Sequence, residues 1–519
     1  MLKNIKKTKN EIKKCDFNVA LVHLNGTLNM TSAGLHSFLD KQGYNVNSIF
    51  FRELDFLGKS KITKNEIDAL ISFLKEFNPH IIGMSVQSMS FWDCVDITLE
   101  IKKHISCPII WGGIQPMIDA ERCLDYSDII IRGEAEYAMV NLFERLRKKK
   151  PYTDLKNLWI KTKNGKLHKN ECGDLIQNLD ELPYPDFTDK NKTYIINGKI
   201  LMKNPAPHYK YEYNITSSRG CPMNCTFCFE HVLNKEFKFK YLRRRSVDNV
   251  IGELKLAIQL YPKIKKINFW DNIFTMDKLW IKEFSEKYGK EIGLPFFCYS
   301  HSLLIKDPDM IKWLYAAGMN DIFFGMQTGS EKLRKQVYNR PESNTDVVVA
   351  AKIVRKYAPR CELRFDMIMS GFEKPDILRE GVNFLLTLPK PFGINKNFMA
   401  YYLNFEITKK ALAKGIISSE DIASVNRNIR TQVATKKNVL LNPFITYYYL
   451  VGRRYVPNFL IKLFLITKFE TKHPKLFCKL FEFFDWFETK SQEIYRIKYL
   501  LRNKEFKYLL KKIFLRAKT

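Results

Sequence analysis

The chain lacks long apolar runs, and this absence limits where the protein can reside. The first fourteen residues, MLKNIKKTKNEIKK, are rich in lysine and hold no apolar stretch of the kind that forms a signal peptide. Elsewhere no apolar run reaches the roughly 20 residues that a membrane-spanning helix needs. We therefore expect a cytoplasmic protein.

A disulfide framework is also missing. The chain has 11 cysteines, an odd number. Eight of them are scattered: Cys15, Cys94, Cys107, Cys123, Cys172, Cys298, Cys361 and Cys478. The other three, Cys221, Cys225 and Cys228, lie close together. An odd total with one tight group favours a metal site in a reducing compartment over a set of disulfides.

Negative charge is scarce beside positive charge. Lys and Arg number 85 against 55 Asp and Glu, which gives a net charge of +30. The excess gathers in a basic tail at residues 1–15 and over about the last ninety residues, which carry a net charge of roughly +13. A basic surface suits nucleic acid, an anionic membrane surface or acidic small substrates, and composition does not choose among them.

What the sequence does contain is a first α/β region at residues 16–150. Strands are expected at Asn18–Val22, Ser48–Phe51, His80–Val86, Pro108–Trp111 and Asp128–Ile131, with amphipathic helices between them. The alternation predicts a doubly wound, flavodoxin-like parallel sheet. Residues 151–212 differ, because Asn164-Gly165 predicts a β-hairpin and Leu182–Phe187 (LPYPDF) is typical of a linker.

A second α/β region is expected at residues 213–403. Its strands are predicted at Tyr213–Ser217, Lys266–Trp270, Phe296–Ser300, Asp321–Met326, Glu362–Met369 and Asn397–Tyr402. Six such strand–helix units predict a partial (β/α)6 TIM-like barrel, with its reactive end at the carboxyl ends of the strands.

Residues 404–519 are basic, aromatic and helical in pattern. A stripe of Phe477, Leu480, Phe481, Phe484 and Phe487 lies on one predicted helical face. Such helices either pack on the protein core or contact a membrane surface, as Phe444–Val451 and Phe459–Ile466 beside Arg453 and Arg454 would allow. No recognised RNA-binding signature occurs there, so nucleic acid is the less favoured partner.

The clustered cysteines lie in Ser217–Glu230 (SSRGCPMNCTFCFE), directly after the first predicted barrel strand. Thiolates suit an iron–sulfur cluster or zinc. Three ligands leave one iron of a four-iron cubane open to an exogenous ligand. Structural zinc prefers four ligands, often in two C-x2-C pairs, and only His231 offers a nearby fourth. The spacing therefore favours a [4Fe-4S] cluster with Cys221, Cys225 and Cys228 as its metal ligands.

This motif, with Phe227 before the third cysteine, resembles the cluster motif of the radical S-adenosylmethionine (SAM) superfamily, over roughly residues 214–403. The resemblance implies a partial βα barrel and a methionyl group of SAM bound to the open iron. One-electron reduction by an external donor such as flavodoxin or ferredoxin would then yield methionine and the 5′-deoxyadenosyl radical.

Other stretches resemble cofactor contacts of that family. They are Phe269–Asn272, Gly325–Ser330 (GMQTGS), Asn339-Arg340 and the fifth barrel strand. The resemblance implies that the barrel binds its cofactor through Phe227, Asp271, Asn272, Gln327, Ser330, Arg340, Arg364 and Asp366. Two simpler explanations remain open: Asp271 caps the next helix, and Gly325 and Gly329 only permit tight turns.

Three segments of the first region end strands, where open α/β sheets bind ligands: His80–Val86, Trp111–Pro116 and Ile131–Glu136. With LPYPDF, they resemble the cobalamin-binding domain that precedes many radical SAM barrels. The resemblance implies cobalamin contacts from Ser85, Gly112, Gly113, Gln115, Gly133 and Glu134.

Two departures from the cobalamin pattern matter. Gln115-Pro116-Met117 follows the double glycine, where the family often has His-Pro-Thr. Leu21 replaces the Asp of the D-x-H-x-x-G motif, of which His23-x-x-Gly26 remains. Because the supporting carboxylate is missing, we expect cobalamin to bind without a histidine lower ligand, and a loss of cobalamin binding stays open.

The resemblances imply a radical SAM enzyme and point to cobalamin-dependent methyl transfer to an unactivated carbon of a small-molecule or lipid-like substrate. Relatives use the same parts for ring formation or rearrangement. A tRNA methylthiotransferase-like enzyme is one alternative, although it normally carries a second cysteine triad in the front domain. A non-catalytic iron–sulfur protein is another. The sequence singles out no catalytic side chain beyond the cofactor ligands.

Overall fold

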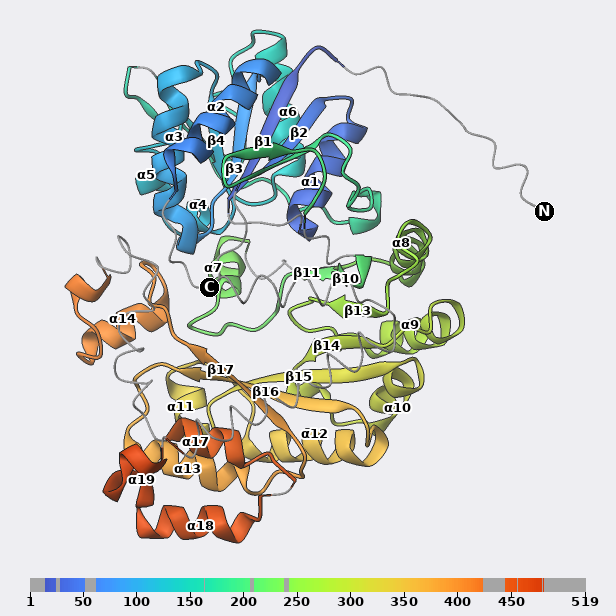
Figure 1. Ribbon diagram of the computed structural model, residues 1–519, viewed down its shortest axis with the longest axis vertical. Coiled ribbons are helices and arrows are strands. Elements are labelled where there is room, and N and C mark those ends of the chain that lie inside the picture. Colours follow the sequence, from blue (N-terminus) through green and yellow to red (C-terminus); the bar gives the residue numbers. More distant parts are fainter. Residues whose placement is uncertain are drawn as a thin grey trace.

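The computed structural model describes residues 15–24, 29–51, 62–162, 164–205, 210–237, 242–422, 444–454, 456–477 and 479. Figure 1 shows two α/β bodies stacked along the long axis, with α7 (Phe229–Glu236) between them and the last helices at the far end of the second body. Each body is built on its own mainly parallel sheet.

The N-terminal sheet has nine strands in the order β7-β6-β5-β4-β3-β1-β2-β8-β9. Its parallel centre consists of β1 (Asn18–Leu24), β2 (Asn45–Phe51), β3 (Ile81–Ser85), β4 (Ile109–Gly112) and β5 (Ile129–Ile131). This order confirms the predicted flavodoxin-like sheet.

Helices cover both faces of this sheet, so its central strands are buried along almost their whole length. The helices are α1 (Met30–Lys41), α2 (Lys64–Phe77), α3 (Phe91–His104), α4 (Ile114–Ile118), α5 (Ala120–Cys123) and α6 (Glu136–Arg147). Helices α1 and α6 pack on one face around Phe38 and Phe143, and α2 and α3 pack on the other around Leu74 and Ile101.

Residues 151–212 extend the same sheet at both edges. They form β6 (Leu158–Lys161), β7 (Leu167–Lys169), β8 (Lys192–Ile196) and β9 (Lys199–Leu201). The β6–β7 pairing confirms the predicted hairpin. The β8–β9 hairpin was not predicted, although its turn carries the same signal, Asn197-Gly198, with both residues at positive φ. Residues 151–212, expected to be a linker with a hairpin, thus also contribute strands to the N-terminal sheet. The predicted domain boundaries stay predictions.

The second sheet has six strands, all parallel, in the order β10-β13-β14-β15-β16-β17. They are β10 (Glu212–Ile215), β13 (Lys266–Phe269), β14 (Phe296–Ser300), β15 (Met319–Gln327), β16 (Glu362–Met369) and β17 (Gly393–Phe398). The helices between them are α8 (Val247–Leu260), α9 (Lys278–Glu291), α10 (Pro308–Ala316), α12 (Asn344–Tyr357) and α13 (Pro375–Leu385). This confirms the partial (β/α)6 barrel.

The predicted last strand, Asn397–Tyr402, is wrong by four residues at each end, because β17 runs from Gly393 to Phe398. The prediction relied on the apolar residues of 398–402, most of which lie beyond the end of the strand. Met399 and Tyr401 are buried outside the sheet, in a cluster with Phe372 and Phe405.

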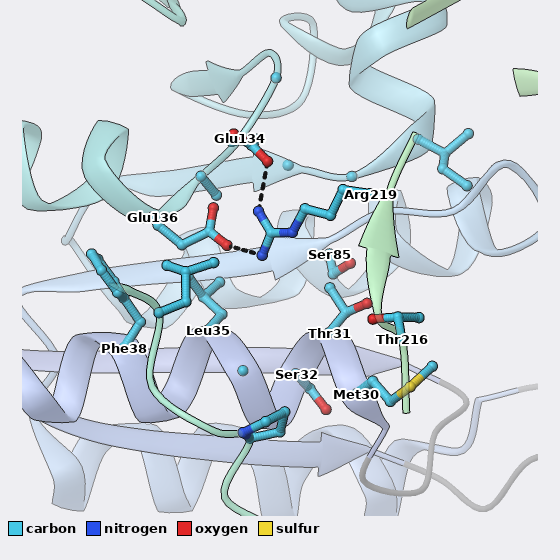
Figure 2. Close-up of a pocket in the computed structure, with 18 of the residues that line it drawn as sticks. Met30, Thr31, Ser32, Leu35, Phe38, Ser85, Glu134, Glu136, Thr216 and Arg219 are labelled. Carbon is cyan, nitrogen blue, oxygen red and sulfur yellow. Dashed lines mark hydrogen bonds and ion pairs between the residues drawn. The ribbon is translucent and has the colours of Figure 1, made fainter. Parts of the chain in front are cut away.

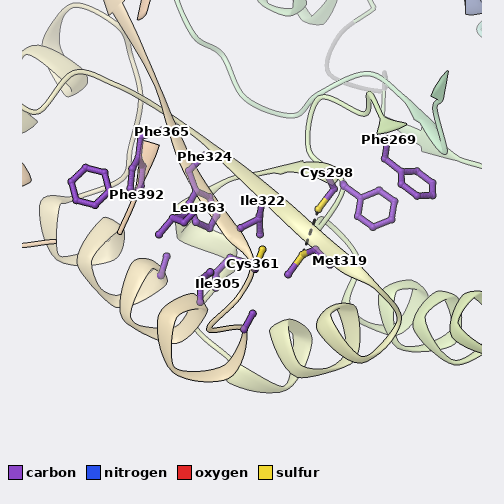
Figure 3. Close-up of a cluster of buried hydrophobic side chains, with 14 of the residues drawn as sticks. Phe269, Cys298, Ile305, Met319, Ile322, Phe324, Cys361, Leu363, Phe365 and Phe392 are labelled. Atoms are coloured by element: carbon purple, nitrogen blue, oxygen red, sulfur yellow. Dashed lines mark hydrogen bonds between the residues drawn. The ribbon is translucent and has the colours of Figure 1, made fainter. Parts of the chain in front are cut away.

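The barrel core lies between the sheet and its helices, and it explains two of the scattered cysteines. Cys298 and Cys361 are buried among Ile322 and Leu363, and Cys298 Sγ lies 3.9 Å from Met319 Sδ (Figure 3). Buried thiols in such surroundings act as small apolar side chains.

The described C-terminal residues are helical, as predicted. They form α14 (Glu406–Ala413), α17 (Phe444–Leu450), α18 (Asn458–Thr467) and α19 (Phe469–Lys472), and short 3-10 turns occur earlier at Ser88–Ser90, Leu179–Glu181 and Ser302–Leu304. The predicted stripe from Leu480 onward lies outside the described residues. Within the described part of the chain, none of the helices has both the length and the apolar character needed to span a bilayer.

Candidate functional site

The three clustered cysteines share one loop at the barrel end that faces the N-terminal sheet. The loop follows β11 (Ser218–Arg219), and Cys228 is the N-cap residue of α7 (Phe229–Glu236). All three are free thiols, and Cys221 and Cys225 are only 8% and 5% exposed. The positive end of a helix dipole favours thiolates, so the start of α7 suits a metal-binding cysteine.

Side chains and backbone fix this loop at several points. Thr226 donates from its hydroxyl to the Val337 carbonyl at 2.7 Å and from its N–H to the Tyr338 carbonyl at 3.1 Å. Asn234 donates to the Cys221 carbonyl at 2.9 Å, and Asn339 donates to the Asn224 carbonyl at 2.8 Å. The loop backbone is therefore held by the protein itself.

The donor set fits a three-cysteine cluster. Burial raises the pKa of Cys221 and of Cys228 to about 12, so these thiols hold their protons until a metal displaces them. Among the described residues, no three His, Cys, Asp or Glu side chains are placed to share a single metal ion. A cubane does not require that arrangement, because each thiolate binds a different iron.

A cavity of about 500 Å³ lies between the two sheets. Six of the predicted cofactor residues line it: Ser85, Gly112, Gly113, Gly133, Glu134 and Asn272. Figure 2 shows its wall formed by α1, through Met30, Thr31, Ser32, Leu35 and Phe38, and by Thr216 and Arg219 at the barrel end. The α1 residues were not predicted, because nothing in the helix sequence marks them. The cavity therefore joins the strand ends of the first sheet to the mouth of the barrel.

The shape of the cavity fits a large ligand. A Cβ on Gly112 would meet no atom nearer than 4.0 Å, and one on Gly34 would meet none within 4 Å, so both glycines leave open wall. Gly113, by contrast, has φ +98°, and a Cβ there would lie 3.0 Å from the Val86 carbonyl, so the turn itself requires glycine. Gln115 is buried but does not line the cavity.

Ion pairs cross from the cluster loop to the N-terminal sheet. Arg219 donates to Glu134 and to Glu136, each at 2.6 Å (Figure 2), and Arg243 donates to Glu134 at 2.9 Å. Burial opposes ionisation, yet Arg243 and Arg219 hold the pKa of Glu134 below its usual value. Neither Arg219 nor Glu136 was predicted as a site residue, although Arg219 stands two positions before the first cluster cysteine.

Glu230 and Asn272 form the polar part of the cavity next to α7. Asn272 donates to Glu230 Oε1 at 2.7 Å, whereas the buried Glu230 Oε2 has no hydrogen-bond partner within the described chain. Burial raises the pKa of Glu230 to about 7. A buried carboxyl oxygen left unpaired at a cavity wall is a group that a ligand can satisfy.

His23 also lines the cavity. It is 8% exposed, its ring stacks on Phe50 with centroids 5.1 Å apart, and its Nε2 has no hydrogen-bond partner among the described residues. Burial, with His36 adding to it, lowers the pKa of His23 to about 3, so the imidazole is neutral. Whether cobalamin binds without histidine ligation stays a prediction.

Several predicted cofactor residues do not line the cavity and have partners within the protein. Asp271 accepts from the Ser217 N–H at 3.0 Å and from its hydroxyl at 2.8 Å. It does not cap the next helix, because Asp277 does. Asp271 thus ties the end of β13 to the strand that leads into the cluster loop.

Gln327, Ser330 and Phe227 likewise serve the local fold. Ser330 is the N-cap of α11 (Glu331–Gln336) and donates to Glu380 at 3.1 Å. Gln327 has φ +69°, and its Nε2 would lie 2.7 Å from a Cβ on Gly325, so a side chain at Gly325 would displace the Gln327 amide. Phe227 packs edge-on against Tyr338.

Arg364 and Asp366 lie on β16, away from the cavity. Asn395 joins them, since Arg364 Nη1 donates to its Oδ1 at 3.2 Å and its Nδ2 donates to Asp366 at 2.8 Å. Burial raises the pKa of Asp366. Arg340 is nearer the cluster, with Nη1 3.5 Å from Cys225 Sγ. The cofactor roles of Arg340, Arg364 and Asp366 stay predictions.

Comparisons with known proteins match both halves of the site. Residues 215–379 match the Radical SAM superfamily, and residues 33–143 match the B12 binding domain. An uncharacterized methyltransferase of Pyrococcus horikoshii is 26% identical over 340 residues, which cover 63% of this chain and 67% of the relative.

Two solved structures share the fold. One is OxsB, a cobalamin-dependent SAM radical enzyme with aqua-cobalamin and SAM bound, at TM-score 0.58 and 20% identity, covering 78% of this chain. The other is TsrM, a radical SAM methyltransferase from Kitasatospora setae, at TM-score 0.60 and 14% identity, covering 77% of this chain and 76% of TsrM. This chain spans only 56% of the OxsB chain.

The matched domains define the cofactors. A radical SAM domain implies a [4Fe-4S] cluster and SAM, and a B12-binding domain implies cobalamin. The free thiols on one fixed loop fit the first, and the open glycine wall at the strand ends fits the second. The chain therefore carries a B12-binding domain at residues 33–143, followed by a domain of the radical SAM superfamily at residues 215–379.

Proposed function

We propose that this protein is a cobalamin-dependent radical SAM methyltransferase that methylates an unactivated carbon of a small-molecule or lipid-like substrate. One observation carries the proposal: a single cavity is lined both by the strand ends of the B12-binding domain and by the barrel mouth beside the cluster loop. SAM at the cluster and cobalamin, held on opposite walls of the cavity, would face each other. A substrate between them could then lie close to both, as transfer of a methyl group from cobalamin to the substrate requires.

The residues of the chain have distinct parts in this proposal. When bound, the cluster and SAM supply a deoxyadenosyl radical, and cobalamin supplies the transferable methyl group. Cys221, Cys225 and Cys228 hold the cluster, and Gly34 and Gly112 leave room for the corrin. Because the cavity lies between the two sheets, cofactors bound in it would have protein on both sides.

Cleavage of SAM would need one electron from outside, and the reduction of cobalamin before a second SAM remethylates it would need another, since the thiol ligands donate none. We assign this to a one-electron carrier such as flavodoxin or ferredoxin. A basic protein with net charge +30 would attract an acidic carrier by long-range electrostatics.

Anaerobic reconstitution tests the proposal. Full-length protein loaded with iron, sulfide and cobalamin should contain about four irons and about one corrinoid per chain, and with SAM and dithionite it should release 5′-deoxyadenosine. A bound zinc ion or a cubane closed by a fourth protein ligand would contradict the assignment. A loaded cluster without 5′-deoxyadenosine would indicate a non-catalytic iron–sulfur protein.

Cys225→Ala sharpens this experiment, because a cubane held at three corners loses one of its three anchors. The variant should fail to load the cluster while the N-terminal domain still binds cobalamin. Cys298→Ala is the matched control, since Cys298 is another buried thiol, placed in the barrel core, and this variant should load the cluster normally.

The tRNA methylthiotransferase alternative requires a second cysteine triad. Cys94 and Cys123 are buried in one core cluster of the N-terminal domain, and the half-buried Cys107 packs against the same cluster. Cys15 packs against the other core cluster of this domain. Eight irons per chain in the reconstituted protein would favour that alternative, and four would favour the methyltransferase.

We further propose that the C-terminal region makes peripheral contact with an anionic membrane. On α18, Phe459, Leu463 and Ile466 are 71%, 51% and 79% exposed, at the i, i+4 and i+7 spacing of one helix face. Lys462 and Lys468 are exposed beside them. The acid of the adjoining helix, Glu470, is buried and paired with Arg379. Exposed apolar side chains beside exposed lysines are the pattern of a helix that lies in a lipid interface.

A further inference from the structure

A chain of buried charged side chains runs from the cluster loop into the barrel. Arg340 Nη1 lies 3.5 Å from Cys225 Sγ, its Nε donates to Glu342 Oε1 at 2.7 Å, and its Nη2 donates to the Gly325 carbonyl. Arg340 is 6% exposed and Glu342 is fully buried. The guanidinium therefore has three fixed partners, of which one is a predicted cluster ligand.

His301 continues this chain on the far side of Glu342. It is 2% exposed and follows β14, and its Nδ1 accepts from the Leu303 N–H at 3.3 Å. That bond places the ring proton on Nε2, which lies 3.3 Å from Glu342 Oε2. Burial opposes its ionisation, yet His301 and Arg340 lower the pKa of Glu342 to about 2, so it remains a carboxylate.

The neighbouring Arg334 is a second buried arginine, and its hydrogen-bond partners differ from those of Arg340. It is fully buried, and it donates to the Thr328 carbonyl at 2.8 Å and the Glu342 carbonyl at 3.2 Å. Arg334 thus binds loop backbone and, at 3.0 Å, the Asn344 side chain, and no cysteine of the described chain is among its hydrogen-bond partners. Arg340, in contrast, directs a charged N–H at a sulfur.

We propose that Arg340 is a positioning residue that donates to the Cys225 thiolate and raises the reduction potential of the cluster, with Glu342 and His301 holding its guanidinium in place. This inference rests on the proposed function only in requiring the cluster to be present. Hydrogen bonds to cluster sulfurs and nearby positive charge stabilise the reduced, more negative state. The role differs from the direct cofactor contact that the family resemblance implies for Arg340.

The test compares the cluster midpoint potentials of full-length, anaerobically reconstituted proteins, measured without SAM by electron paramagnetic resonance during reductive titration. Arg340→Gln should have a lower midpoint potential than wild type at the same iron content, because it loses both charge and donor. Arg340→Lys should fall between them, since lysine keeps the charge but cannot reach Glu342 and Cys225 together. Arg334→Gln is the matched control and should titrate like wild type.

The outcomes separate this inference from the proposed function. A wild-type protein that takes up no four-iron cluster overturns the proposed function. A wild type that loads normally, with equal potentials in wild type and Arg340→Gln, overturns the inference alone, as does an equal shift in Arg334→Gln. If Arg340→Gln does not fold, the comparison rests on Arg340→Lys. A cluster midpoint potential in Arg340→Lys identical to that of wild type would refute the proposed role of Arg340.

Discussion

Arg219 donates to Glu134 at 2.6 Å, and this ion pair joins residues 85 positions apart in the sequence. It links the strand that enters the cluster loop to the loop that follows β5 in the B12-binding domain. Arg219 reaches Glu136 at the same distance, so one guanidinium clamps both acids. Because both acids line the cavity, this clamp fixes the distance across which two cofactors would face each other.

Arg219→Ala should loosen the two domains. Truncating one member of a partly buried charge pair should cost about 2 kcal/mol, less than the full value for a buried pair because about a third of the Arg219 side chain is exposed. We expect two separated unfolding transitions by calorimetry of the apoprotein, where wild type shows more coupled unfolding. Arg147→Ala removes a surface arginine that also pairs with a glutamate, and it should change stability by less than about 0.5 kcal/mol. An equal effect of both variants would show that the clamp is only a surface pair.

Gly112→Leu should abolish cobalamin binding without unfolding the protein. The backbone of Gly112 leaves space for a Cβ, so the longer side chain would extend into the cavity. Gly112→Ala serves as the graded control and should weaken binding only modestly, because it adds one carbon. Corrinoid absorbance after gel filtration measures both variants, and wild-type binding by Gly112→Leu would place the corrin elsewhere.

Much of this fold could be predicted from the sequence because its signals are local. Apolar runs and helical periodicity marked β1 to β5 and their helices, and cysteine spacing marked the cluster loop. The strand β17 was misplaced because its own sequence, GINKNF, is mostly polar, while the apolar residues after it pack in a loop.

The site was harder to predict, since its contacts join distant elements. Nothing near Arg219 in the sequence indicates Glu134, and nothing in α1 indicates that its first turns line a cavity. Asp271 and Ser330 were predicted as cofactor contacts from a resemblance to family stretches, and the structure shows that each also makes a hydrogen bond that holds a loop or caps a helix. A motif gives the position of a side chain, but its partners depend on tertiary packing.

His23 should make the stability of the apoprotein pH-dependent. Its pKa is about 3 in the folded protein and about 6.5 when unfolded, so the unfolded chain binds the extra proton between these values. Stability from this group is complete above pH 6.5 and falls as the pH drops toward 3, by about 1.4 kcal/mol at pH 5.5. His23→Phe keeps an aromatic ring against Phe50 and should lack this component. The loss of thermal stability between pH 7.5 and 5.5 should therefore be smaller in the variant, and an equal loss would show that His23 titrates normally.

The exposed face of α18 should bind anionic vesicles. The full-length protein should sediment with phosphatidylcholine vesicles that contain phosphatidylglycerol and remain in solution with phosphatidylcholine alone. The combined variant F459S/L463S/I466S should bind more weakly by roughly 3 kcal/mol, about a hundredfold, since each side chain contributes about 1 kcal/mol on partial insertion. Leu279→Ser is the matched control, because Leu279 is 80% exposed on α9 of the barrel and should not matter. Salt at about 0.5 M should weaken the binding by screening the lysines.

Equal binding by the triple variant would assign the membrane contact to another surface. If the wild-type protein does not bind vesicles but is a dimer in solution, and the triple variant is a monomer, this face would be a contact between two copies of the chain.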